Sequence, residues 1–233
     1  MKHTIVDKIR KTAGQYSYLS VLLFYLAIQA VFSHLENTVV PRYYMENRLD
    51  RYIPFVKVFV VPYLFWFIYI VGALVYLGLR SRKDFLGLCA FMFIGMSICM
   101  VIYYLLPNGQ RLRPIIMDTD IFSRMIKAVY KNDTPTNVAP SIHVLNSIAV
   151  HVALVRYEPF GKNRLLKWTS FAIMVSIILS TVFIKQHAAI DVLWGMVLSC
   201  AMYYLVYRVL PFDKPYAAFD RVVHENVGSR SSG

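Results

Sequence analysis

The sequence predicts an all-α fold: a polytopic membrane protein built as a bundle of six transmembrane helices. The first reason is composition, because 58% of the 233 residues are hydrophobic and the mean hydropathy is +0.49. A soluble domain of this size needs far less apolar surface. The second reason is that apolar runs of about 20 residues, the length that crosses a bilayer, recur along the chain. The third is that six such runs place every cluster of polar candidate residues on one side of the membrane.

The six predicted spans are not equally clear in the sequence. The fourth is the shortest, and polar side chains such as His143 and Asn146 interrupt it. We retain it because the parity of the spans then places all the candidate chemistry on one side. The spans form one membrane domain, residues 1–227, followed at 228–233 by a disordered tail or a cloning remnant. They cover residues 16–32, 55–79, 85–106, 141–155, 168–183 and 190–210.

The segments around the spans carry signals of their own. Residues 2–11 alternate apolar and basic positions, which fits a short helix on the membrane surface or, equally well, a disordered basic tail. The apolar run that follows is too long for the core of a signal peptide, so we expect it to remain as an anchor. Within the long segment 107–140, residues 121–130 show the apolar spacing of a helix that lies on the membrane. Asp118 and Asp120 before this helix fit an N-cap signal better than a cation site.

Basic residues are distributed unevenly between the two sides. Of 25 Lys and Arg residues, 15 lie on the side of the N-terminus and 9 on the opposite side, while Lys57 lies inside a span. Under the positive-inside rule we expect both termini in the cytoplasm and the polar clusters on the exterior or periplasmic side of a bacterial cytoplasmic membrane. The formal charge of +12 is dispersed at the span ends. We therefore expect anionic membrane lipids as partners and no nucleic acid.

The strongest functional signal lies between the fifth and sixth spans. Lys185, His187 and Asp191 come close together at membrane depth, where each charge costs about 2.5–3.5 kcal/mol and therefore indicates function. If the segment is helical from His187 onward, Asp191 lies one turn above it on the same face. A carboxylate there holds one ring nitrogen of the histidine and directs the other outward as a nucleophile or base.

Two further polar clusters are expected on the same side of the membrane. Arg111 and Arg113 follow the third span, and Ser141 and His143 open the fourth. Guanidinium groups match the oxygens of a phosphate, and a lysine adds a point charge. The combined set of side chains therefore favours a phosphate ester as substrate, with no metal and no cofactor.

At these positions the chain resembles the type 2 phosphatidic acid phosphatase (PAP2) superfamily of membrane lipid phosphatases. The three blocks of that superfamily read roughly K-x6-R-P, P-S-G-H and S-R-x5-H-x3-D. The chain offers Arg113-Pro114, then Pro140-Ser141-Ile142-His143, then Ser180-Thr181-x5-His187-x3-Asp191. The order, the spacing and the side of the membrane agree. The resemblance implies a six-helix bundle of PAP2 type and a lipid phosphate as substrate.

The resemblance also implies a role for each matching residue. His187 attacks phosphorus to give a phosphohistidine, and Asp191 orients it. His143 protonates the leaving oxygen and then activates the water that hydrolyses the intermediate. Ser141 and Arg113 hold the non-bridging oxygens of the phosphate.

The chain departs from the family blocks at three positions. Leu106 and Thr181 stand where the family has Lys and Arg, and Ile142 replaces the Gly of the second block, so it offers phosphate only its backbone N–H. Lys185 would supply missing charge if the turn after Thr181 stays helical. The alternative is a lysine whose ammonium simply reaches the membrane surface. For Arg111, phosphate binding and no role in the site stay equally open.

We expect a metal-independent lipid phosphatase that hydrolyses a phosphomonoester or a diphosphate through a phosphohistidine. Phosphatidate, phosphatidylglycerol phosphate and polyprenyl diphosphate are open alternatives as substrates. Reduced blocks of this kind also resemble the inositol phosphorylceramide synthase and sphingomyelin synthase branch, whose members transfer a headgroup to an alcohol. A third alternative is a non-catalytic lipid-phosphate binder or translocator that has kept the fold.

Overall fold

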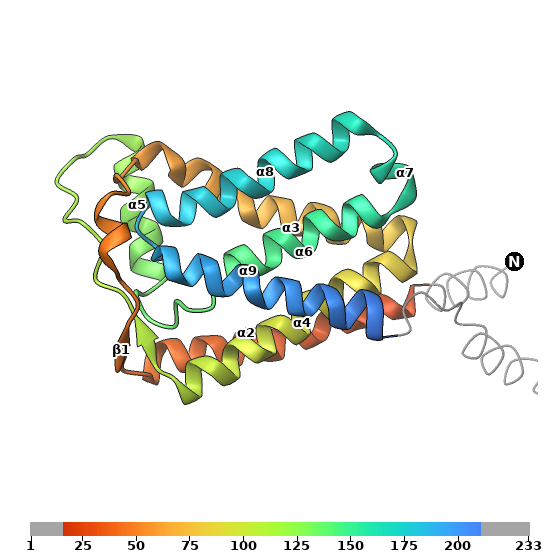
Figure 1. Ribbon diagram of the computed structural model, residues 1–233, viewed down its shortest axis with the longest axis horizontal. Coiled ribbons are helices and arrows are strands. Elements are labelled where there is room, and N and C mark those ends of the chain that lie inside the picture. Colours follow the sequence, from red (N-terminus) through yellow and green to blue (C-terminus); the bar gives the residue numbers. More distant parts are fainter. Residues whose placement is uncertain (1–15, 211–233) are drawn as a thin grey trace, which may run out of the picture.

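The computed structural model describes residues 16–210 as one bundle of helices that run roughly along its long axis (Figure 1). The predicted surface helix at 2–11 and the tail at 228–233 lie outside this range. In chain order the elements are η1 (Ser17–Leu22), α2 (Leu23–Thr38), β1 (Tyr43–Tyr44), η2 (Arg48–Arg51), η3 (Lys57–Phe59), α3 (Val60–Arg80), α4 (Arg82–Leu105), β2 (Asn108–Gly109), α5 (Ile121–Asn132), α6 (Ile142–Arg156), α7 (Glu158–Gly161), α8 (Arg164–Phe183), α9 (Ala189–Tyr204) and η4 (Leu205–Val209), the last a π-helical turn.

All six predicted spans are helical, which confirms the fold class. Five helical segments of the described chain are long and apolar enough to cross a bilayer: 17–38, 57–80, 82–105, 164–183 and 189–209. The remaining span, α6, has 15 residues. At about 1.5 Å per residue it is roughly 22 Å long, which is shorter than a bilayer core of about 30 Å. It packs against α3, α4, α8 and α9, so the other helices shield it from lipid.

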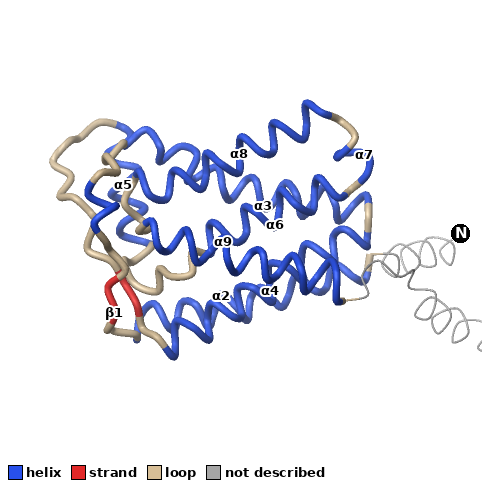
Figure 2. The backbone as a smooth tube through the Cα atoms, viewed as in Figure 1, coloured by secondary structure: helices blue, strands red, loops and turns tan. Residues whose placement is uncertain are grey.

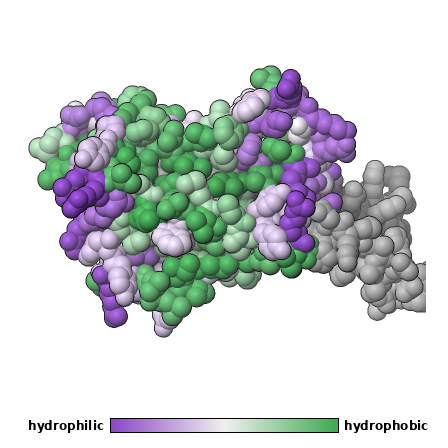
Figure 3. Space-filling view, in the orientation of Figure 1, coloured by the Kyte–Doolittle hydropathy of each residue, from purple (hydrophilic) through white to green (hydrophobic). Residues whose placement is uncertain are grey.

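The surface of the bundle follows the pattern of a membrane protein. Figure 3 shows a hydrophobic band across the middle of the molecule and hydrophilic residues gathered toward its two ends. On α3, the exposed Phe67, Ile68, Val71 and Val75 form part of this apolar surface. Since their spacing follows the helical repeat, one face of α3 is directed at lipid and the opposite face at the core.

The first long helix extends beyond its predicted end. The expected span stops at residue 32, whereas α2 continues to Thr38. Polar side chains in the last turns bond back to the helix: Asn37 donates to the carbonyl of Ser33 at 2.7 Å, and Thr38 donates to that of His34 at 2.6 Å. These bonds satisfy groups that would otherwise favour a loop. The expected outer loop therefore begins later than predicted.

Two long connections, residues 39–56 and 106–141, lie at the end of the bundle that is on the left in Figure 2, and we call them the cap. Strands β1 and β2 pair in parallel there, with Tyr43 opposite Asn108. Asn108 is buried and bonds to the backbone of the chain just before α6: its Oδ1 accepts from Val138 and Ala139, and its Nδ2 donates to Ala139. This single side chain thus ties the end of α4 to the start of α6.

The amphipathic helix predicted in this cap is present as α5. Asp120 is its N-cap, as predicted, and accepts from the backbone of Phe122 and Ser123. The ammonium of Lys57 lies 2.7 Å from Asp118 and 2.6 Å from Asp120. Hydrogen bonds from Lys57 and from the Ser123 side chain hold the pKa of Asp120 well below its usual range. The two acids therefore anchor the cap to the start of the second span.

Candidate active site

The site is built on the turn between α8 and α9. Helix α8 ends at Phe183, and the carbonyl of Thr181 accepts hydrogen bonds from the backbone of both Gln186 and His187, at 2.9 and 3.0 Å. Lys185 has a φ of 55°, a left-handed conformation that turns the chain sharply. His187 consequently precedes the new helix, which begins at Ala189, so the condition that the segment is helical from His187 onward is not met.

His187 and Asp191 nevertheless meet as predicted. Nδ1 of His187 lies 3.4 Å from Oδ2 of Asp191, and both side chains are buried. The same Oδ2 accepts the backbone N–H of Ala188 at 2.8 Å, as an acidic side chain in the first turn of a helix commonly does. Since an ionised carboxylate only accepts hydrogen bonds, this contact places the His187 proton on Nδ1. The Nε2 lone pair is then free to act as a nucleophile.

His143 lies on the other side of His187. Its Nδ1 is 3.4 Å from Nε2 of His187, and its ring lies against the rings of Tyr63 and Trp66, with centroids 4.7 and 4.4 Å away. It is the second residue of α6, and Ser141 caps that helix by accepting from the backbone of Val144. Two aromatic rings and a helix start therefore fix its orientation toward His187.

The helices that carry the two histidines touch closely. The backbone N–H of Ser141 donates to the carbonyl of Asp191 at 3.2 Å. A Cβ atom added at Gly195, one turn further along α9, would lie 2.9 Å from Cβ of Val144 and 3.0 Å from the Ser141 carbonyl. Such distances are too short for carbon. Only glycine at this position lets α9 approach the start of α6 so closely.

A cavity of about 770 Å³ opens beside the two histidines, between α2, α3, α4 and α6. This volume is within the range of small-molecule binding sites. Its polar end contains both histidines and part of the cap, and its other walls are mostly apolar and aromatic. Residues that line the polar end include Glu36, Asp133, Thr134, Asn137, His143, Asn146, Gln186 and His187, and those along the apolar walls include Ile28, Phe32, Trp66, Phe67, Ile70, Leu74, Met92 and Met96.

Arg113 reaches the site indirectly. Its guanidinium donates to the carbonyl of Tyr130 at 3.1 Å, to that of Asp133 at 2.6 Å, and to the side chain of Gln186. It also stacks over the Tyr130 ring at 4.5 Å. Because it does not line the cavity, its contact with the site runs through the turn that carries His187.

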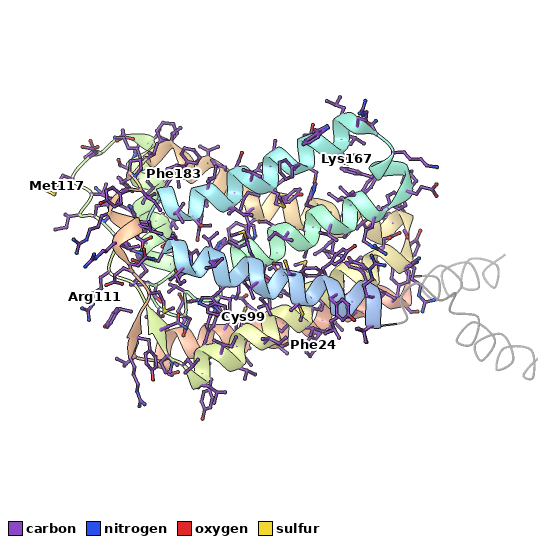
Figure 4. The ribbon with its side chains drawn as sticks, viewed as in Figure 1. Phe24, Cys99, Arg111, Met117, Lys167 and Phe183 are labelled. Atoms are coloured by element: carbon purple, nitrogen blue, oxygen red, sulfur yellow. The ribbon has the colours of Figure 1, made fainter. Side chains whose placement is uncertain are left out.

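The other predicted phosphate ligands lie in different surroundings. The premise for Lys185 is wrong, because the turn after Thr181 is not helical. Its ammonium donates to the carbonyls of Asp50 and Ile53, at 3.0 and 2.5 Å. The guanidinium of Arg111 lies 3.5 Å over the Tyr44 ring at the outer end of the cap (Figure 4).

The second block contributes two more predicted ligands. Ser141 is wholly buried and acts as the cap of α6, so its Oγ faces the helix backbone. Ile142 lines the cavity beside His143. No Lys or Arg is among the described residues that line this cavity, so the cationic phosphate ligands expected in the family pattern are absent from its described wall.

Several residues of the site were not predicted. The hydroxyl of Tyr63 donates to Oδ2 of Asp133 at 2.6 Å, and the amide of Gln186 donates to the same oxygen at 3.1 Å. Asp50 binds the first turn of α9, because its Oδ1 accepts the backbone N–H of Ala189 at 2.8 Å. For these residues the sequence held one signal, the position of Gln186 directly before His187. Tyr63 and Asp50 lie far from the blocks in the chain, and Asp133 lies in the segment between the first two, so only the fold shows that they meet at the site.

Residues 109–215 match the family model of the PAP2 superfamily. Members of that superfamily are generally phosphatases or phosphotransferases. The match includes all three blocks and all eight predicted site residues, whereas helices α2, α3 and α4, which form much of the cavity, precede it. Comparisons with curated proteins and with solved structures gave no match.

Proposed function

We propose that this protein is a membrane phosphatase that hydrolyses a lipid phosphomonoester or diphosphate through a phosphohistidine on His187. The observation that carries the proposal is the chain of contacts from Asp191 through His187 to His143, placed at the polar end of a largely apolar cavity. The PAP2 match supports a phosphatase or phosphotransferase. The apolar wall supports a lipid as substrate, since hydrocarbon placed there leaves contact with polar groups.

In the proposed reaction, Nε2 of His187 attacks phosphorus while the bond from phosphorus to the leaving oxygen breaks. Asp191 stabilises the positive charge that develops on the ring. His143 starts as an imidazolium ion, delivers a proton to the leaving oxygen and afterwards removes one from the water that cleaves the P–N bond, so that both histidines return to their starting states. Because the two rings contact each other in this structure, they have to separate to admit the phosphoryl group between them.

The test is release of inorganic phosphate by the purified protein in detergent micelles, with EDTA present. The lipids are phosphatidate, phosphatidylglycerol phosphate and a polyprenyl diphosphate, and the control is His187→Ala. We expect the native protein to release phosphate and the variant to release none. Equal release by both would overturn the proposal. Binding of the lipids without turnover would instead favour a lipid-phosphate binder.

Transfer of a headgroup to an alcohol is a second candidate, and one observation favours it. The described wall of the cavity carries the carboxylates of Glu36 and Asp133 but no Lys or Arg. Carboxylates repel a doubly charged phosphomonoester more strongly than a singly charged phosphodiester. A labelled phosphodiester lipid, incubated with and without an alcohol acceptor, separates the two reactions. A product that forms only with the acceptor establishes transfer.

We also propose that the site faces the exterior or periplasm, as the charge distribution favours. Met117 in the cap is 82% exposed, and Lys167 lies at the other end of the bundle (Figure 4). Cysteines introduced singly at these positions, in a protein with Cys200→Ser, are to be labelled in intact cells with a reagent that cannot cross the membrane. Labelling at position 117 and not at 167 is expected, and the reverse pattern would invert the orientation.

A further inference from the structure

Three side chains on the cavity wall carry polar atoms that have no hydrogen-bond partner within the described structure. Both amide atoms of Asn137, Oδ1 of Asn146 and Nε1 of Trp66 are buried and unpaired. Asn137 is 4% exposed and Asn146 is 2% exposed, and all three residues line the cavity. Leaving a buried polar group unpaired is costly, and unpaired groups that share one cavity indicate a ligand that satisfies them.

These groups are fixed in place next to the histidine pair. Asn146 follows His143 by three residues on α6, so it lies on the same face, one turn deeper in the bundle. Its Nδ2 donates to the sulfur of Met96 at 3.4 Å, which orients the amide. The Trp66 ring packs against that of His143 at a tilt of 41°, with 4.4 Å between the ring centroids. The Nε1 of Trp66 and the Oδ1 of Asn146 therefore lie beside the position proposed for the phosphate.

Asn137 belongs to the same wall but comes from the cap. Its φ is 55°, and its backbone N–H donates to the carbonyl of Asn108 at 2.7 Å. Asparagine tolerates this left-handed conformation better than most residues. The backbone is thus held by Asn108, while the amide side chain is left for a ligand.

The chemistry of the unpaired groups defines the ligand. Trp66 offers a donor, Asn146 an acceptor, and Asn137 both. A carbonyl and a hydroxyl or amide N–H on the carbons next to the phosphate complement this set. A prenyl phosphate has only hydrocarbon at those carbons, and it leaves all three groups unpaired. A site with buried hydrogen-bonding groups discriminates strongly against an analogue that lacks the partners.

We propose that Trp66, Asn137 and Asn146 form a linkage subsite, which binds the carbonyl and hydroxyl or amide groups beside the phosphate of the lipid. The subsite rests on the proposed function, because it assumes that the phosphate binds at the histidines. It selects lipids with a polar linkage, such as glycerolipids, over polyprenyl phosphates.

The test is equilibrium binding to the protein with His187→Ala, which leaves the lipids intact, by isothermal titration calorimetry in micelles. Oleoyl lysophosphatidate carries an ester and a hydroxyl, N-oleoyl ethanolamine phosphate carries an amide, and oleyl phosphate carries neither. We expect at least one polar-linked lipid to bind about tenfold or more tightly than oleyl phosphate, as one good hydrogen bond allows. The better of the two identifies the linkage.

Asn146→Leu is the decisive variant, because leucine has nearly the same size but no hydrogen-bonding group. It should abolish the preference while leaving the affinity for oleyl phosphate unchanged. Its folding is checked by thermal unfolding, and Trp66→Phe serves as a second variant. Asn37→Leu, on the exposed end of α2, is the matched control. Equal affinities for the three lipids, or a preference that survives both variants, would overturn the subsite. Failure of the proposed function is read separately, from phosphate release by the native protein.

Discussion

Nδ1 of His143 lies 3.4 Å from Nε2 of His187, the nitrogen that the Asp191 contact leaves unprotonated. When Nδ1 of His143 carries a proton, it therefore directs an N–H at Nε2 of His187 while no phosphoryl group lies between the rings. As an imidazolium ion, His143 can pass this proton to the leaving group once the phosphoryl group separates the rings, and it then remains as a neutral imidazole. This relationship makes the two histidines distinguishable by experiment.

Replacement of His143 by Asn should slow lipid hydrolysis by about 10²–10⁴-fold, the usual contribution of general acid–base catalysis. An aryl phosphate such as p-nitrophenyl phosphate needs no proton on its leaving group, so its first step should be retained. Stopped-flow absorbance is then expected to show a burst of p-nitrophenol equal to the enzyme concentration, followed by slow turnover. An equal fall in the rates of hydrolysis of the lipid and of the aryl phosphate, without a burst, would assign His143 a structural role.

Asp191→Asn tests whether the negative charge of Asp191 is needed for catalysis as well as for the stability of the fold. An asparagine oxygen still accepts the N–H of Ala188, so thermal unfolding should change little. The amide no longer stabilises a charged His187, and kcat should fall by about 10²–10⁴-fold, as in comparable histidine–carboxylate pairs. The matched control is Asp84→Asn, in the first turn of α4. A variant with native kcat would show that Asp191 serves only as a helix cap.

Lys185→Met tests whether this lysine anchors the turn or binds phosphate. Its ammonium bonds to the carbonyls of Asp50 and Ile53, so we expect a lower midpoint of thermal unfolding and a lower kcat. The inhibition constant of inorganic phosphate should remain within about twofold, since a direct ionic contact contributes more than that. A tenfold weaker inhibition with unchanged stability would restore the lysine as a phosphate ligand.

Gly195→Ala should disturb the site from a distance. The added methyl group meets Val144 and the Ser141 carbonyl, so α9 has to move away from α6 and carry Asp191 with it. We expect a loss of stability of about 1–3 kcal/mol and a fall in kcat. Gly72→Ala is the control, because no atom lies within 4 Å of the added carbon. Similar behaviour of the two variants would contradict the packing argument.

The spans and the contact between His187 and Asp191 could be predicted from the sequence, because both depend on local or strongly patterned signals. Apolar runs mark the helices, and the four-residue spacing brings Asp191 to His187. The premise for Lys185, a helix that continues after Thr181, is wrong because the chain turns sharply there. Glu36 falls outside the predicted span 16–32, because polarity alone does not reveal that the helix continues to Thr38.

The rest of the site depends on contacts between distant parts of the chain. Tyr63 and Trp66 fall within the predicted span 55–79, and the structure places both on helix α3. Their position against His143 follows from how α3 packs on α6. Sequence spacing carries no information on that packing, so the cavity and its unpaired amides became visible only in the fold.

The position of Asp50 determines how far this protein can be truncated. Asp50 lies well before the region that matches the superfamily, yet it stabilises the turn that carries His187, both through the N–H of Ala189 and through Lys185. A fragment trimmed to the matched region would keep every motif residue but lose this brace and the three helices, α2, α3 and α4, that form much of the cavity. The part of the chain before residue 109 therefore helps to build the candidate site, in addition to its role in the membrane.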